Sequence, residues 1–119
     1  HRAEGYGRCL AEALQLGLDL IATDWSGNKD FCKGPLYYPV PYKLTRVKPL
    51  EYPYWQEQFW AEPNINEAAK ILISVVNKRK REGIPNQEIS QKYQRYFSAI
   101  TCGKRYKKRL EELNLFNAH

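Results

Sequence analysis

Residues 1–28 read HRAEGYGRCLAEALQLGLDLIATDWSGN and predict a turn, a helix and a strand in succession. Gly5 and Gly7 favour a tight turn. Apolar residues at helical spacing then predict a helix over residues 8–16, which Gly17 ends. The apolar run 18–23 predicts a strand buried on both faces of a parallel sheet. This order indicates the α/β class, with residues 24–28 at the sheet edge where such folds bind ligands.

Two carboxylates, Glu4 and Glu12, stand on either side of the glycine turn. The start of a helix presents unpaired N–H groups and partial positive charge, so it attracts anions, and glycine lets a ligand approach the backbone. Two acids around such a turn suit a sugar nucleotide, with Glu12 on the ribose and Glu4 on the sugar. The alternative is a turn without function, because glycine turns before helices and this spacing of acids are both common.

The same stretch resembles the retaining glycosyltransferases of the GT-B fold, typified by bacterial mannosyl- and glucosyltransferases. The family's Glu-Gly-Phe-Gly turn corresponds here to Glu4-Gly5-Tyr6-Gly7, and its later landmarks correspond to Glu12-Ala13, Gly17, Ile21-Ala22-Thr23 and Ser26-Gly27-Asn28. A weaker match continues through residues 37–47, Tyr52-Pro53-Tyr54 and Trp60-Ala61-Glu62-Pro63. The chain departs from the family at Arg8-Cys9, where Leu-Pro is usual, and at Leu18-Asp19, where Pro-Val is frequent.

The resemblance implies a fold and a place for the chain within a larger enzyme. The expected fold is α/β: a partial Rossmann-like domain, the C-terminal domain of a GT-B enzyme, with a short parallel sheet and C-terminal helices. Residues 1–63 would form the donor-site half and residues 64–119 the C-terminal helices. Because the chain contains no Met and begins inside the motif, we expect a fragment that lacks the N-terminal domain.

The resemblance also implies an activity: transfer of a sugar from a nucleotide-diphosphate sugar to an acceptor hydroxyl with retention of configuration. The expected acceptor is a glycan or a lipid-linked molecule in polysaccharide or glycoconjugate biosynthesis. No metal and no cofactor is expected. The expected location is the cytoplasm, including the inner face of the membrane. The fragment alone should be inactive.

The implied site residues lie in the turn and the first helix. Glu4 would be catalytic, and the donor would be bound by Gly5, Tyr6, Gly7, Arg8, Cys9 and Glu12. Two other functions stay open: a nucleotide-sugar-binding module without catalysis, and a basic interaction domain. The second rests on charge, since the net charge is +6 and residues 78–109 hold eleven Lys or Arg against Glu82 and Glu88.

We interpret that basic stretch as a solvated face first, as a site of transient membrane contact second, and as a nucleic-acid site last. No nucleic-acid-binding motif accompanies it, so nucleic acid is not an expected partner. Cys9, Cys32 and Cys102 are too widely spaced for a zinc motif and are interpreted as reduced thiols. No apolar run approaches the roughly 20 residues that span a bilayer.

The rest of the chain predicts short strands and then helices. Ser26-Gly27-Asn28 should cap a short helix over residues 29–31. Segments 36–40 and 42–47 should be edge strands, because Pro39 and Pro41 exclude a central position. The aromatic loop 49–59 is expected to be fixed to the domain by its rings, the alternative being stacking on a sugar.

Residues 64–82 predict the best-defined helix, with a capping box between Asn64 and Glu67 and an end at Gly83. Its expected core face consists of Ile65, Ala68, Ala69, Leu72, Val75 and Val76. Two more helices should follow Pro85, separated at Ser98 or Gly103.

Overall fold

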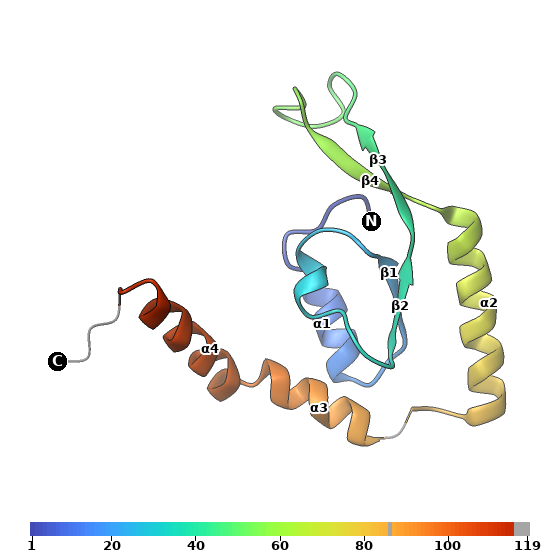
Figure 1. Cartoon of the computed structure of the whole chain (residues 1–119). Coiled ribbons are helices and arrows are strands. Elements are labelled where there is room, and N and C mark those ends of the chain that lie inside the picture. Colours follow the sequence, from blue (N-terminus) through green and yellow to red (C-terminus); the bar gives the residue numbers. More distant parts are fainter. Residues whose placement is uncertain (86, 116–119) are drawn as a thin grey trace.

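The computed structural model describes residues 1–85 and 87–115, which form a mixed α/β structure (Figure 1). The expected α/β class, parallel strand pair and C-terminal helices are confirmed. In chain order the elements are α1 (Arg8–Gln15), β1 (Leu20–Thr23), the 3-10 helix η1 (Gly27–Asp30), β2 (Tyr37–Val40), β3 (Tyr42–Arg46), β4 (Phe59–Pro63), α2 (Ile65–Glu82), α3 (Gln87–Phe97) and α4 (Ala99–Glu112).

The parallel sheet consists of β1 and β2, in a register that pairs Leu20 with Tyr37 and Thr23 with Val40. Pro39, opposite Ala22, has no N–H to donate, and β1 is the one strand paired with β2 in the described chain. The edge position expected for this segment is therefore confirmed. β1 begins at Leu20 instead of Leu18, because the Leu18 N–H still bonds to the Ala13 carbonyl at the end of α1.

The second sheet is an antiparallel hairpin of β3 and β4, whose loop projects from one end of the body (Figure 1). The chain passes from β2 through Pro41 directly into β3, so one extended segment contributes to both sheets. Strand β4 was not predicted, since Trp60–Pro63 was identified only as part of the weaker family match. Residues 1–4 join the two sheets: the Ala61 N–H donates to the Arg2 carbonyl, and the Thr23 hydroxyl donates to the His1 carbonyl.

The hydrophobic core lies where α1, β1 and the segment around η1 meet. Its buried members are Ala11, Leu14, Leu20, Ala22, Phe31, Cys32 and Leu36. Ile89, Tyr93 and Phe97 from α3 pack against this cluster. The apolar residues of 8–16 at helical spacing include Leu10, Ala13 and Leu14. Leu14 is fully buried, Leu10 and Ala13 lie at the margin, and Ala11 takes the central place beside Leu14.

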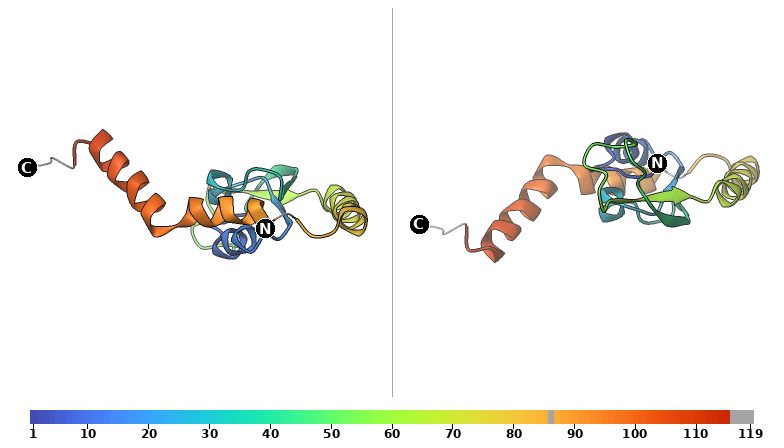
Figure 2. Two further views of the ribbon diagram at one scale, coloured as in Figure 1. Left: turned by 90° about the horizontal axis from the view of Figure 1, so that it is seen from below. Right: turned by 90° about the horizontal axis from the view of Figure 1, so that it is seen from above.

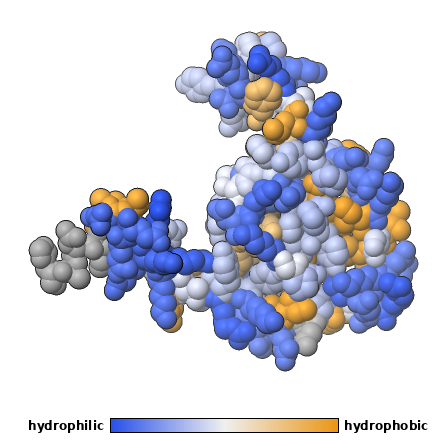
Figure 3. Space-filling view, viewed as in Figure 1, coloured by the Kyte–Doolittle hydropathy of each residue, from blue (hydrophilic) through white to orange (hydrophobic). Residues whose placement is uncertain are grey.

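Helix α2 corrects the prediction of a wide core face on residues 64–82. Only Val75 is buried, whereas Ile65 is 68% exposed and Leu72 and Val76 are also exposed. Figure 3 shows hydrophobic residues at the surface along this side of the molecule. The reason is geometric: α2 contacts the two short strands β1 and β2, which cover only part of it. The Asn64 side chain accepts from the Glu67 N–H at 3.1 Å, so the Asn64 half of the capping box is confirmed.

Helix α3 packs against α1 at the body, and α4 continues from it as an arm (Figure 2). Ser98 separates them and caps α4 by accepting from the Thr101 N–H, whereas Gly103 lies inside α4. The molecule measures 56 × 46 × 17 Å with a radius of gyration of 17.8 Å. A compact domain of this length would have a radius of about 13–14 Å. Much apolar surface is therefore exposed. Within residues 1–85 and 87–115, no helix combines the length and apolar character needed to cross a bilayer.

Candidate functional site

No side chain caps the first turn of α1. Gly7 is its N-cap in the left-handed conformation (φ 85°), which glycine adopts without strain. Gly7 has no side chain that could accept a hydrogen bond from the first N–H groups of the helix, and no acid stands in the first turn. The first intrahelical bond runs from the Ala11 N–H to the Gly7 carbonyl at 3.0 Å. The backbone N–H groups around Gly7, Arg8 and Cys9 therefore receive no side-chain cap from Gly7. They lie at the positive end of the α1 dipole.

The turn before α1 is held by the loop after β1. The Glu4 carbonyl accepts from the Gly27 N–H at 3.0 Å and from the Ser26 hydroxyl at 2.6 Å. This corrects the expected cap at residues 26–28. Ser26 precedes η1 but makes no side-chain cap to it, because its hydroxyl is committed to Glu4. The loop at the carboxyl end of β1 thus lies beside the Glu4 turn, as the α/β pattern predicted.

Glu4 lines a pocket of about 480 Å³ between this turn and the β3–β4 hairpin. The other lining residues are Ala3, Gly5, Ser26, Val47, Tyr52, Gln58, Phe59 and Trp60. Glu4 is partly buried, and its Cγ lies 3.2 Å from where a Cβ on Gly7 would be. Glu4 therefore stands between the start of α1 and an aromatic-walled pocket.

Glu12 is placed differently from Glu4. It lies one turn inside α1 and is exposed. Its carboxylate accepts from Arg8 Nε at 2.8 Å, and both side chains are largely exposed. Glu12 is not among the residues that line the Glu4 pocket. A ribose bound by Glu12 would therefore lie on the outer side of the α1 start, with Arg8 as its competitor for the carboxylate.

The Tyr6 ring lies in a groove separate from the positions of Glu4 and Glu12. It packs on Phe31 with centroids 5.0 Å apart and lines a groove of about 350 Å³ with Phe97 of α3 and Arg105 of α4. Burial raises the pKa of Tyr6. Of the predicted donor residues, the structure thus groups Glu4 and Gly5 at the pocket and Gly7, Arg8 and Cys9 at the helix start. The Tyr6 ring is turned toward α3 and α4.

The aromatic loop 49–59 was expected to be fixed to the domain by its rings, and the exposure of three of these rings shows that this expectation was wrong. Tyr52 is 63% exposed, Tyr54 is 87% exposed and Phe59 is 51% exposed. Sequence reasoning missed Gln58 and Trp60 as pocket residues, because it missed the pairing of β3 with β4. Two extended segments separated by a Pro- and Tyr-rich loop were the available signal for a hairpin.

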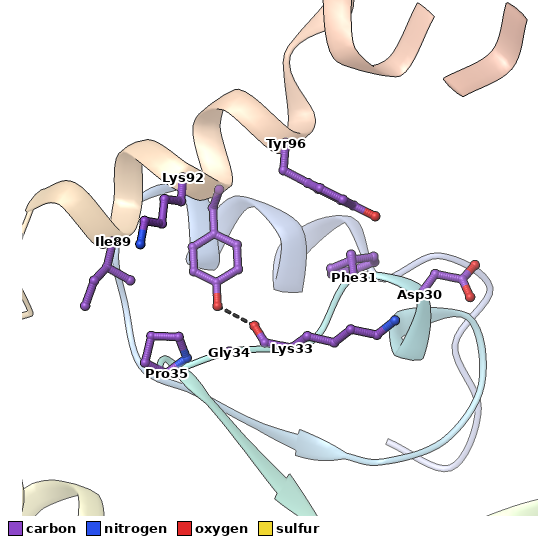
Figure 4. A pocket seen from close by; sticks show the side chains of 9 residues that line it. Asp30, Phe31, Lys33, Gly34, Pro35, Ile89, Lys92 and Tyr96 are labelled. Carbon is purple, nitrogen blue, oxygen red and sulfur yellow. Dashed lines mark hydrogen bonds between the residues drawn. The ribbon is translucent and has the colours of Figure 1, made fainter. Parts of the chain in front are cut away.

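A second cavity, of about 400 Å³, lies between the η1 region and α3 (Figure 4). It is lined by Asp30, Phe31, Lys33, Gly34, Pro35, Ile89, Lys92, Tyr93 and Tyr96. The Tyr93 hydroxyl donates to the Lys33 carbonyl and closes one wall. Burial raises the pKa of Tyr93, so this phenol stays neutral and serves as a structural donor. No predicted site residue lies here.

No family model, no curated protein and no solved structure matches this chain. In the part of the chain that the structure describes, no group of three or more His, Cys, Asp and Glu residues could hold a metal ion.

Proposed function

We propose that this chain binds the nucleotide-sugar donor of a retaining glycosyltransferase and forms part of a Rossmann-like GT-B domain. The observation that carries the proposal is the junction at Gly7. There an uncapped helix start meets, within three residues, a partly buried carboxylate that faces a pocket. The diphosphate would lie on the α1 amides, and the sugar would extend toward Glu4.

The chemistry follows from where charge develops. As the glycosidic bond breaks, negative charge grows on the leaving diphosphate, and N–H groups fixed at a helix start stabilise it. Arg8, at the first position of α1, adds a cation near this point. Glu4 would orient the transferred sugar near its reacting carbon. Its position is fixed because its own carbonyl is held by Ser26 and Gly27.

The partners implied are the nucleotide sugar, a glycan or lipid-linked acceptor, and an N-terminal domain of the same enzyme. Metal and other cofactors are not part of the proposal. A module that binds nucleotide sugar without transferring it is the second candidate, because binding requires only the helix start and the pocket. An assay of sugar transfer separates the two.

The test uses the natural protein that contains this sequence. Ligand-observed NMR against a panel of nucleotide-diphosphate sugars should identify a donor, and Glu4→Gln should then lower kcat by about 100-fold or more while nucleotide affinity changes little. Glu57→Gln, at an exposed acid outside the pocket, is the control and should leave kcat unchanged. Sugar transfer at the wild-type rate by the Glu4 variant would contradict the catalytic role.

A further inference from the structure

The pocket beside Glu4 has aromatic walls that come from one hairpin. Tyr52 belongs to the hairpin loop, and Phe59 and Trp60 begin β4. The opposite side is formed by Ala3, Glu4, Gly5 and Ser26. Residues 3–5 and 47–60, more than 40 residues apart in the sequence, therefore line one pocket of about 480 Å³, which is large enough for a small ligand.

The charges around this pocket limit what it can bind. Among its nine lining residues only Glu4 carries a charge, and Gln58 and Ser26 add uncharged polar groups. Two arginines lie over rings of this pocket: Arg2 lies over Trp60 at 4.6 Å and is also paired with Glu62, and Arg46 lies over Phe59 at 5.5 Å. A phosphate would meet a carboxylate here and no lysine or arginine on the lining.

A pocket lined by aromatic rings, one carboxylate and one side-chain amide is suited to an uncharged ligand that has both apolar faces and hydroxyl groups. A pyranose has this character, since its C–H face can lie on an aromatic ring while its hydroxyls donate to Glu4 and Gln58. We propose that this pocket binds a neutral hexopyranose and that the hairpin aromatics Tyr52 and Phe59 determine which hexose is accepted. This inference rests on the proposed function only for the assignment of that hexose to the donor.

The hairpin loop has the features of a recognition element. Leu50, Tyr54 and Glu57 all have positive φ (67°, 54° and 61°), which costs energy for residues other than glycine. The bond from the Val47 N–H to the Gln58 carbonyl closes its neck at 3.0 Å, and Val47 is buried. The loop thus has a fixed base and presents rings to solvent that a bound ligand would cover.

The test measures saturation-transfer NMR on the natural protein that contains this chain, with methyl α-D-glucopyranoside, methyl α-D-mannopyranoside and methyl α-D-galactopyranoside as probes. UDP and GDP are measured in parallel as reporters of the α1 start. Tyr52→Leu should reduce glycoside affinity by about three- to tenfold. Tyr52→Phe should retain it, because the ring and not the hydroxyl makes the contact.

Tyr54→Leu is the matched control, since Tyr54 lies in the same loop but does not line the pocket. It should leave the signals of all three glycosides unchanged. Nucleotide binding that is equal in wild type and Tyr52→Leu, together with the loss of glycoside signal, supports the proposal. The absence of signal from every glycoside with the wild-type protein, or equal signals from Tyr52→Leu and Tyr54→Leu, overturns it. The loss of UDP and GDP binding with glycoside binding intact would instead remove the donor function and leave the hexose pocket standing.

Discussion

Gly27 lies so close to Gly5 that a Cβ at position 27 would stand 1.8 Å from the Gly5 carbonyl oxygen. The contact is backbone on backbone, so no side chain can move aside. Gly27→Ala must therefore displace one of the two loops, and we expect it to lower the free energy of unfolding by roughly 1–3 kcal/mol. Because the Gly27 N–H holds the Glu4 carbonyl, the variant should also weaken donor binding. Urea denaturation and calorimetry with the donor measure the two effects.

Gly103→Ala is the matched control for this substitution. Gly103 lies inside α4, and a Cβ there would meet nothing within 4 Å. Alanine favours a helix, so this variant should be more stable by about 0.4–1 kcal/mol. If Gly27→Ala were as stable as wild type, the close approach of the two loops would be wrong.

The ion pair between Asp19 and Arg79 predicts how stability depends on pH. Arg79 donates from Nε to Oδ2 and from Nη2 to Oδ1, and both side chains are mostly buried. The hydrogen bond from Arg79 lowers the pKa of Asp19 below its usual value. The stabilisation is therefore fully present above about pH 4, the unfolded value, and is lost as the pH falls through the folded pKa. The unfolding free energy of wild type should fall over that acidic range.

Asp19→Asn removes the charge that titrates in this pair. At pH 7 the variant should be less stable than wild type by roughly 1.5–3 kcal/mol, and the two unfolding free energies should converge at acidic pH. Glu12→Gln is the control, because the Arg8–Glu12 pair is exposed and is expected to contribute less than about 1 kcal/mol. A constant difference between Asp19→Asn and wild type across all pH values would contradict the role of the ion pair.

The proposed ribose contact of Glu12 gives a test that uses the nucleotide itself. If Glu12 binds ribose hydroxyls, wild type should prefer UDP or GDP over the corresponding 2′-deoxynucleotide, and Glu12→Ala should lose about tenfold in affinity for the ribonucleotide. The variant should no longer distinguish the two nucleotides. Arg8→Gln frees the carboxylate of Glu12, so this variant should keep the preference. Equal calorimetric affinities of wild type and Glu12→Ala would exclude the contact.

The local elements were predictable from the sequence because their signals lie within a few residues. Gly7 and Gly17 bound α1, Asn64 caps α2, and the prolines at 39 and 41 placed β2 at an edge. The pocket was not predictable, because it depends on the pairing of β3 with β4 across a 12-residue loop and on the Ser26 hydroxyl bonding to Glu4 instead of capping η1. The exposure of α2 was not predictable for a similar reason. The spacing of its apolar residues indicates an apolar face, but it does not show which element, if any, covers that face.

Helix α4 gives the test of membrane contact. Tyr106 and Leu110 of α4 and Leu113 at its C-cap recur at helical spacing and are exposed, Tyr106 by 74%. The basic residues among them are Lys104, Arg105, Lys107, Lys108 and Arg109, of which Lys107 is paired with Glu111, and Lys108 and Arg109 with Glu112. A helix with an apolar stripe between basic side chains binds anionic lipid surfaces, with about 1 kcal/mol per basic residue near the surface. Changing Lys104, Arg105, Lys107 and Lys108 together to Gln should therefore reduce sedimentation with vesicles that contain phosphatidylglycerol and leave sugar transfer intact.

Lys80→Gln with Arg81→Gln, on exposed residues at the end of α2, removes charge away from α4 and is the control. Equal sedimentation of the α4 variant and wild type, or equal binding of wild type to phosphatidylcholine vesicles, would leave the basic residues of α4 as solvated surface.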